Sequence, residues 1–211
     1  MVYDIAPSLQ EFREKLESKH PESKLDEMDW LRCSHALKYV KGDSALEIGP
    51  GVGMIIDSLT KRGIDVAGLD LAPQSKAMFP EGIELQLGSI ADPLLKLEKY
   101  STVICMEVLE HLQVAANPVA LANLRYAATE RLIITVPYNE REPLWHADQP
   151  GGHRQKFTID KAAEVFPNAY ATMLPRYYEE WLFIIEDKAN PAPYFSLVSR
   201  SKLAQITGAS Q

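Results

Sequence analysis

A run of alternating glycines is the most informative feature of the sequence. Gly49, Gly51 and Gly53 follow the apolar stretch "SALEI" and precede the helical pattern "MIIDSLTKR". A glycine-rich turn between a strand and a helix lets a ligand approach the backbone closely, because no side chains block it. The pattern therefore predicts a cofactor-binding loop. The alternative is an ordinary glycine-rich connection between a strand and a helix.

An acidic residue ends the next apolar run, and it narrows the class of cofactor. A dinucleotide fingerprint, G-x-G-x-x-G, would need a third glycine where the sequence has Met54. The pattern E-x-G-x-G-x-G is complete from Glu47 to Gly53, and "IDVAGLD" ends in Asp70. An acid at that place can accept hydrogen bonds from both hydroxyls of a ribose. A nucleoside-containing cofactor other than a nicotinamide or flavin dinucleotide is the prediction.

Five segments in order carry a family resemblance: "LEIGPGVG", "GLDLA", "GSIADPL", "VICMEVLEHL" and "RLIITVPY". Together they resemble the motifs of class I S-adenosylmethionine-dependent methyltransferases, from Ser44 to about Tyr138. The stretch "CMEVLEHL" is similar to that of the small-molecule group that includes the quinone-biosynthesis O-methyltransferases. Membership of this group would leave the substrate open.

The resemblance assigns one set of residues to the methionine portion of S-adenosylmethionine. It implies that Glu47 and the loop with Gly49, Gly51 and Gly53 hold this portion, and that Met106 lies against the cofactor. Arg32 stands roughly where some relatives place a basic residue for the cofactor carboxylate, but a surface arginine is the favoured interpretation.

A second set is implied for the adenosine portion. Asp70 would take the ribose hydroxyls, and Leu71 would pack beside the adenine. Ser89 stands where many relatives carry an aspartate, and its hydroxyl can bond the adenine amino group. The backbone N–H of Ile90 can serve a ring nitrogen.

Candidate catalytic residues follow the predicted fourth strand. Ligands bind at the carboxyl ends of parallel strands, where Glu107, Glu110 and His111 are expected. His111 is the first candidate for a general base or for orienting the nucleophile. A histidine that only braces the loop is the alternative, and either glutamate can orient that ring or hold the loop.

The long segment "PYNEREPLWHADQPGGHRQKFT" supplies two further candidates. A segment of this length without periodicity is typical of function or mobility, and we expect a substrate-side lid from Pro137 to Phe157. His146 and His153 are predicted to contact the acceptor or to pack the lid. With Asp148 they superficially match a site of two histidines and one carboxylate, but this spacing alone is weak, and no metal is predicted.

The elements that must position these residues alternate between strands and helices. Apolar runs such as "IDVAGLD", "IELQLG" and "STVICM", separated by helical patterns, predict a doubly wound, mostly parallel α/β sheet. Near the C-terminus, "EEWLFIIEDK" and "YFSLVSRSK" flank "ANPAP", which suits an antiparallel hairpin. We expect a Rossmann-like sheet of seven strands with an antiparallel C-terminal edge strand.

A helical leader is expected before the sheet. Ser8 and Glu11 match a capping box at the start of one helix, and a second helical stretch opens at Pro21 and runs to Gly42. We predict two parts: a leader of residues 1–42 that packs on the outside, and a methyltransferase domain of residues 43–211.

Composition limits the partners. Of the 211 residues, 46% are hydrophobic and 24% are charged, as in ordinary globular proteins, and the net charge of −7 disfavours nucleic acid. Cys33 and Cys105 are expected to be buried thiols in a reducing compartment. No apolar run is long enough to span a membrane, and no signal peptide is readable. A cytoplasmic monomer or homodimer is the expectation.

The predicted function is methyl transfer from S-adenosylmethionine to a small-molecule acceptor, most simply at oxygen. Nitrogen and carbon acceptors stay open. Two alternatives are weighed: a protein that binds S-adenosylmethionine without catalysis or as a regulator, and an oxidoreductase, which Met54 disfavours.

Overall fold

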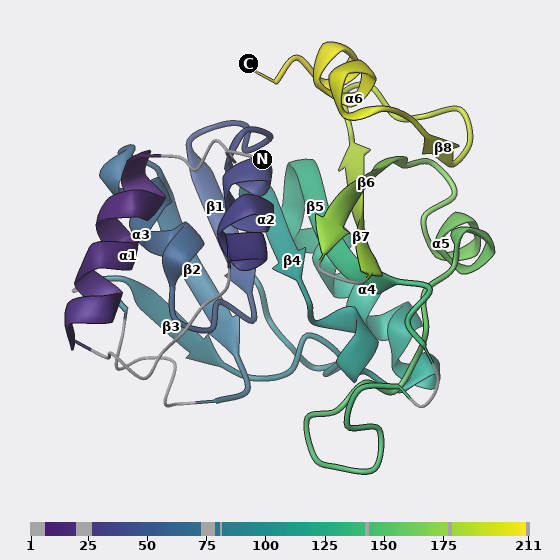
Figure 1. Ribbon diagram of the computed structural model, residues 1–211, viewed down its shortest axis with the longest axis horizontal. Coiled ribbons are helices and arrows are strands. Elements are labelled where there is room, and N and C mark those ends of the chain that lie inside the picture. Colours follow the sequence, from purple (N-terminus) through teal and green to yellow (C-terminus); the bar gives the residue numbers. More distant parts are fainter. Residues whose placement is uncertain are drawn as a thin grey trace.

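The computed structural model describes residues 7–19, 27–72, 79–80, 82–141, 144–176 and 179–209 (Figure 1). The helices are α1 (Pro7–Lys19), α2 (Glu27–Leu37), α3 (Met54–Lys61), α4 (Asn117–Ala127), α5 (Ile159–Val165) and α6 (Arg200–Thr207). The strands are β1 (Ser44–Ile48), β2 (Asp65–Asp70), β3 (Glu84–Leu87), β4 (Tyr100–Met106), β5 (Ala128–Tyr138), β6 (Tyr170–Arg176), β7 (Glu179–Asp187) and β8 (Ser196–Leu197). Two 3₁₀ turns, η2 (Leu109–His111) and η3 (Val114–Ala116), lie between β4 and α4.

One mostly parallel sheet forms the centre of the molecule, in the order β3-β2-β1-β4-β5-β7-β6-β8. The pairs of β1 with β2 and β4, of β2 with β3, and of β4 with β5 are parallel. Strand β7 runs antiparallel to both of its neighbours, β5 and β6. The predicted α/β class with one antiparallel strand is confirmed, but the sheet has eight strands rather than seven, and β7 lies inside it rather than at its edge.

The predicted hairpin around "ANPAP" is wrong. Strand β7 forms its hairpin with β6, which precedes it, and the segment after "ANPAP" contributes only the two residues of β8, parallel to β6. Beyond β8, the side chain of Ser199 accepts a hydrogen bond from the N–H of Lys202 and caps α6. Because Ser199 caps this helix, the segment "SRSK" begins α6 and does not continue a strand. Strand β6 was not predicted, because Thr172 and Pro175 interrupt its apolar pattern.

Side chains of alternate residues fill two cores, one on each face of the sheet. In β4, Ile104 and Met106 belong to the core shared with α1, α2, α3 and α6, whereas Val103 and Cys105 belong to the core shared with α4 and α5. In β7, Phe183 likewise faces the first core. This period of two, with apolar residues on both faces, is the physical reason for the doubly wound arrangement.

The N-terminal helices contribute to the first core. Leu9, Phe12 and Leu16 of α1 are buried in the cluster that contains Ile55 and Leu59 of α3. Helix α1 begins at Pro7, so Ser8 lies inside the helix instead of capping it, and the second helix begins by Glu27. The predicted helix start at Pro21 lies outside the described residues. The boundary between residues 42 and 43 stays a prediction.

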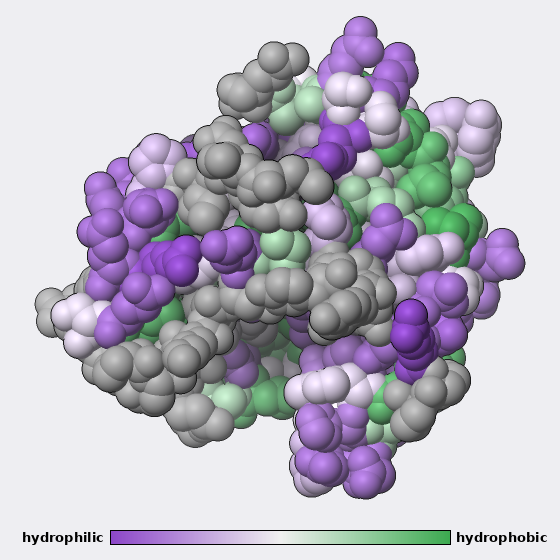
Figure 2. Space-filling view, in the orientation of Figure 1, coloured by the Kyte–Doolittle hydropathy of each residue, from purple (hydrophilic) through white to green (hydrophobic). Residues whose placement is uncertain are grey.

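The described surface of the viewed face has both hydrophilic and hydrophobic areas. Figure 2 shows hydrophilic side chains over α1 and over the projecting loop of residues 144–153 at the bottom of the view. In the described part of the chain, no helix has the length and apolar character that crossing a bilayer requires. Cys33 and Cys105 are buried free thiols, as predicted.

Candidate functional site

The glycine loop joins β1 to α3 in a conformation that most residues avoid. Gly49, Gly51 and Gly53 have φ angles of 66°, 53° and 82°. In this left-handed region a side chain is strained, so the alternating glycines are required by the backbone itself. A Cβ atom on Gly51 would meet no atom within 4 Å, which leaves open space beside the loop.

A cavity of about 280 Å³ adjoins this loop. Its walls come from α2, the end of β1, the glycine loop, the start of α3 and the end of β4. The lining residues are Asp29, Arg32, Cys33, Glu47, Gly49, Pro50, Gly51, Val52, Met54, Met106 and Glu107. The structure thus brings four predicted cofactor residues together: Glu47, Gly49, Gly51 and Met106.

Glu47 is a buried polar group of this cavity with an unsatisfied oxygen atom. The residue is 5% exposed, and its Oε2 atom is buried with no hydrogen-bond partner among the described residues. Burial raises the pKa of Glu47 to about 8, against the opposing effects of the backbone N–H of Ile56 and of the Arg32 guanidinium. A buried carboxyl oxygen without a partner is costly, so a cationic ligand group in this cavity would stabilise it.

Arg32 lies in the same cavity and is buried, so the surface interpretation is wrong. Its Nη1 atom lies 3.3 Å from Oε1 of Glu107, and its Nη2 atom lies 3.0 Å from Oδ1 of Asp29. The guanidinium also lies over the ring of Trp181, 4.8 Å from the ring centroid. The Nε atom is buried and has no hydrogen-bond partner among the described residues. Arg32 can therefore donate to an anionic ligand group.

Glu107 links Arg32 to the sheet. Its backbone has a φ angle of 55°, which is strained for a glutamate. Oε1 accepts a hydrogen bond from Thr135 at 3.1 Å, and Oε2 accepts one from Nε1 of Trp181 at 2.8 Å. Sequence reasoning did not assign Asp29 to the wall of this cavity, or Trp181 to the ring that lies beneath the Arg32 guanidinium. Asp29 lies three residues before Arg32, which puts both side chains on one face of α2, and this spacing could have indicated their contact.

The residues expected to hold adenosine lie at the neighbouring strand ends. Asp70 ends β2, and its Oδ1 atom accepts the N–H of Ala72 at 2.8 Å. Leu71 is 72% exposed, whereas Ile90 is buried. Ser89 Oγ already accepts the N–H of Ala91 at 3.1 Å. None of these four residues lines the 280 Å³ cavity, and neither does Gly53, the N-cap of α3. Their cofactor roles stay predictions.

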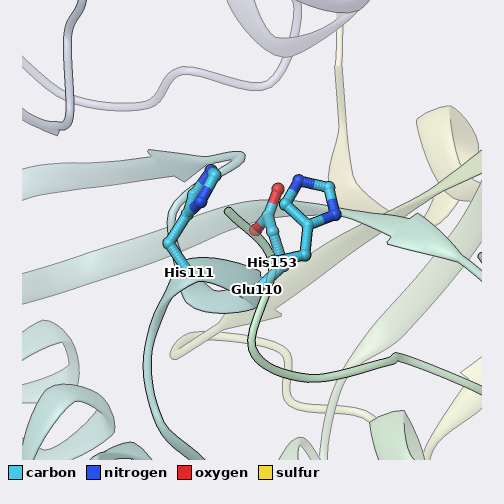
Figure 3. Close-up of side chains that lie close together, drawn as sticks. All are labelled: Glu110, His111 and His153. Atoms are coloured by element: carbon cyan, nitrogen blue, oxygen red, sulfur yellow. The ribbon is translucent and has the colours of Figure 1, made fainter. Parts of the chain in front are cut away.

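A second cluster lies beyond the end of β4. Glu110 and His111 belong to η2, and His153 comes from the long loop after β5. One ligand atom from each of the three side chains lies within 4.8 Å of the others, as Figure 3 illustrates. The rings of His111 and His153 are 4.9 Å apart and meet edge to face. Two imidazoles and a carboxylate can exchange a proton or bind a divalent cation.

Burial determines the protonation of His111. Burial, and then the neighbouring ring of His153, lower the pKa of His111, although the backbone of Gly151 and Gly152 acts in the opposite direction. The lowered pKa favours the neutral imidazole, which is the form that accepts a proton or binds a metal.

His146 is separated from this cluster. It is exposed, has a φ angle of 46° and packs its ring 4.4 Å from that of Trp145. Asp148 is exposed as well. In the described residues, the grouping of two histidines and a carboxylate therefore joins His153 to His111 and Glu110 instead of to His146 and Asp148.

The loop that carries His153 is tied to η2 and to itself. The N–H groups of Arg154 and Gln155 donate to the carbonyl of Glu110, at 2.7 Å and 3.3 Å. The side chain of Gln155 donates to the carbonyls of Leu109 and Leu112. Within the loop, the His153 N–H donates to the carbonyl of Trp145. These bonds hold His153 beside η2 in this structure.

Comparison with known proteins points to one family. A family model described as a methyltransferase domain matches residues 3–170. The ubiquinone biosynthesis O-methyltransferase of Burkholderia thailandensis is 31% identical over 101 residues, which cover 44% of this chain and 42% of the relative. The match therefore covers less than half of the length of this relative.

Solved structures share the fold. TehB from Haemophilus influenzae has a TM-score of 0.62 at 15% identity, covering 83% of this chain and 66% of that one. The 1,6-didemethyltoxoflavin-N1-methyltransferase of Burkholderia thailandensis was crystallised with bound 1,6-didemethyltoxoflavin and S-adenosylhomocysteine. It has a TM-score of 0.59 at 16% identity and covers 88% of this chain and 92% of that one. At such identities the similarity concerns the fold alone.

Proposed function

This chain belongs to the family of S-adenosylmethionine-dependent methyltransferases, and from that premise we propose that it methylates a small molecule. The observation that carries the proposal is the buried Oε2 atom of Glu47 in the cavity beside the glycine loop, which has no hydrogen-bond partner in the part of the chain that the structure describes. A carboxylate there suits the amino group of the methionine portion, and Arg32, in the same cavity, suits its carboxylate. The residues present therefore fit S-adenosylmethionine.

The cavity side chains would act by placement. When bound, the cofactor supplies a methyl group on a positively charged sulfur, and its transfer is an in-line substitution that depends on alignment. Met106 ends β4 and lines the cavity, and Glu110 and His111 follow it in η2. The side of the site toward η2 is accordingly where we place the acceptor.

We propose oxygen as the acceptor atom. The name of the 31% identical relative specifies O-methylation, and a hydroxyl nucleophile loses a proton during transfer. His111 and His153 supply ring nitrogens at the end of β4 that can take this proton, and the half-exposed ring of Trp145 lies 5.2 Å from that of His153. An aromatic or apolar acceptor with a hydroxyl group suits these neighbours.

Product analysis tests this proposal. Purified protein and ¹³C-methyl-labelled S-adenosylmethionine are incubated separately with phenol, catechol, aniline and no acceptor. We expect S-adenosylhomocysteine to form with a hydroxylated acceptor, and the ¹³C shift of the product to identify an O-methyl group. A labelled amine product would overturn the choice of oxygen. Tight cofactor binding with no transfer to these probes or to a pool of cellular metabolites would favour the non-catalytic alternative.

The cluster of Glu110, His111 and His153 favours a second candidate chemistry. We propose that these three side chains can hold a divalent cation, since their ligand atoms lie within 4.8 Å of one another. A cation there would bind the acceptor oxygen and lower the pKa of its hydroxyl. Dialysis against EDTA, followed by Mg²⁺, Mn²⁺ or Zn²⁺, should abolish and then restore turnover. Full turnover of protein shown by mass spectrometry to be metal-free would exclude this role.

A further inference from the structure

Glu140 and His153 form a buried pair behind the cluster. His153 is 4% exposed and Glu140 is 5% exposed, and the Nδ1 atom of His153 lies 2.6 Å from Oε2 of Glu140. Glu140 follows β5, in the segment after Tyr138 and Asn139. A hydrogen bond to an ionised carboxylate is short and strong, so it fixes both the position of the ring and the proton on Nδ1.

The second carboxylate oxygen of Glu140 is also used. Oε1 accepts a hydrogen bond from the N–H of Trp145 at 3.1 Å. The backbone next to it is anchored, because the N–H of Asn139 donates to the carbonyl of Phe157 at 2.8 Å. Glu140 is therefore held from two sides, and the direction of its bond to His153 is set by the fold.

We propose that Glu140 is a positioning residue that holds His153 as the Nδ1–H tautomer and so presents the Nε2 lone pair to Glu110 and His111. With Nδ1 occupied by Glu140, Nε2 is the ring nitrogen left for the cluster, and the ring edge that faces Glu110 in Figure 3 carries it. The inference rests on the proposed function in one respect: that function gives the Nε2 atom its role, which is to accept a proton or to bind a cation. A carboxylate behind a histidine has this effect in many metal sites.

A purely structural role is the competing explanation, because Glu140 also joins Trp145 to the rest of the loop. Two variants separate the explanations. Glu140→Gln keeps the shape and one acceptor but loses the charge, whereas Glu140→Ala removes both bonds. Glu164→Gln is the matched control, because Glu164 is 73% exposed in its side chain and lies on α5, in a contact with Lys161.

The first measurement is the tautomer of His153, which needs neither cofactor nor cation. Long-range ¹H–¹⁵N correlation spectra of the full chain are recorded at a pH of about 8.5, two units above the ordinary histidine pKa. The His153→Gln variant assigns the signal by its loss. We expect the Nδ1–H form in the wild type and in Glu164→Gln, and a shift toward the Nε2–H form in Glu140→Ala. An Nε2–H form in the wild type, or an unchanged Nδ1–H form in Glu140→Ala, would overturn the proposal.

The second measurement compares cation and cofactor binding in the same variants. Titration with Co²⁺, followed by its visible absorption, should show affinity falling in the order wild type, Glu140→Gln, Glu140→Ala, with a loss of about 10-fold to 100-fold for alanine. The affinity for S-adenosylhomocysteine should stay unchanged, which shows that Glu140→Ala is folded. Equal Co²⁺ affinity in folded Glu140→Ala and wild type would overturn the proposal.

The two measurements also separate this proposal from the proposed function. A wild type that binds no Co²⁺ would contradict the cation role of the cluster, and the tautomer would then decide the role of Glu140 alone. Absence of methyl transfer in the wild type would contradict the proposed function and leave the tautomer result valid.

Discussion

At the scale of single residues, Glu47 is expected to control how cofactor affinity depends on pH. Burial raises its pKa to about 8, so the carboxyl is mostly protonated at pH 7. An ammonium group favours the carboxylate, and binding must therefore release a proton below pH 8. We predict that affinity for S-adenosylhomocysteine rises from a pH of about 6.5 to 8, by up to about tenfold per unit. Equilibrium dialysis with labelled ligand measures this change.

The Glu47→Gln variant is the control for that prediction. Glutamine cannot ionise, so the affinity of this variant for S-adenosylhomocysteine should no longer depend on pH. The affinity should also be weaker by about 10-fold to 100-fold, because a charge-assisted hydrogen bond is lost. The same affinity for the wild type at both ends of the pH range would contradict the role of Glu47.

His111 is predicted to matter for turnover and not for cofactor binding. The His111→Ala variant should lose about 10²-fold to 10⁴-fold in kcat, since it removes a proton acceptor or cation ligand from η2. His146→Asn, which keeps a residue type tolerant of positive φ, should retain turnover, because His146 is exposed and outside the cluster. Steady-state kinetics with the acceptor found for the wild type measures both. Full turnover of His111→Ala would remove this histidine from the mechanism.

At the scale of elements, the glycine loop allows a test that separates strain from ligand contact. Gly51 and Gly63 have φ angles of 53° and 74°, and a Cβ atom on either would meet no atom within 4 Å. Alanine at either position should therefore lower the free energy of unfolding by a similar amount, about 1 to 2 kcal/mol. Gly51 lines the cavity, whereas Gly63 does not.

We predict that Gly51→Ala weakens binding of S-adenosylhomocysteine at least tenfold, because its methyl group occupies space beside the ligand. Gly63→Ala should bind as the wild type does. Urea unfolding and calorimetric titration of both variants provide the two quantities. Equal affinities for the two variants would show that the ligand does not approach Gly51.

The sequence predicts the elements around the glycine loop better than those near the C-terminus. Strands β1, β2, β4 and β5 are apolar on both faces, and this pattern is visible without a structure. Strand β6 depends on its pairing with β7, which local composition does not reveal. The cluster of Glu110, His111 and His153 joins η2 to a distant loop through tertiary contacts such as the bond from Arg154 N–H to the Glu110 carbonyl. Sequence spacing therefore suggested His146 and Asp148 as partners of His153.

At the scale of the whole molecule, cofactor binding should stabilise the fold. The cavity lies between α2, β1, α3 and β4, which share one core, so a ligand that binds only the folded chain opposes unfolding of all of them. At 100 times its dissociation constant, S-adenosylhomocysteine should add about 2.7 kcal/mol. For a chain of this size this corresponds to a rise in Tm of about 5 to 10 °C. Scanning calorimetry measures it, and a Glu47→Gln protein that shifts as much at the same concentration would contradict the prediction.

The partners of the whole molecule stay predictions. The net charge of −7 disfavours nucleic acid, and a monomer or homodimer is expected. Sedimentation velocity, with and without S-adenosylhomocysteine, gives the state of assembly.

Calorimetric titration of the wild-type protein with S-adenosylhomocysteine tests the central claim, a cofactor site formed by Glu47 and the glycine loop, most directly. The predicted result is saturable binding of one ligand per chain, weakened in Glu47→Gln and in Gly51→Ala and unchanged in Gly63→Ala. Absence of binding, or binding that neither Glu47→Gln nor Gly51→Ala weakens, would contradict the assignment of this cavity.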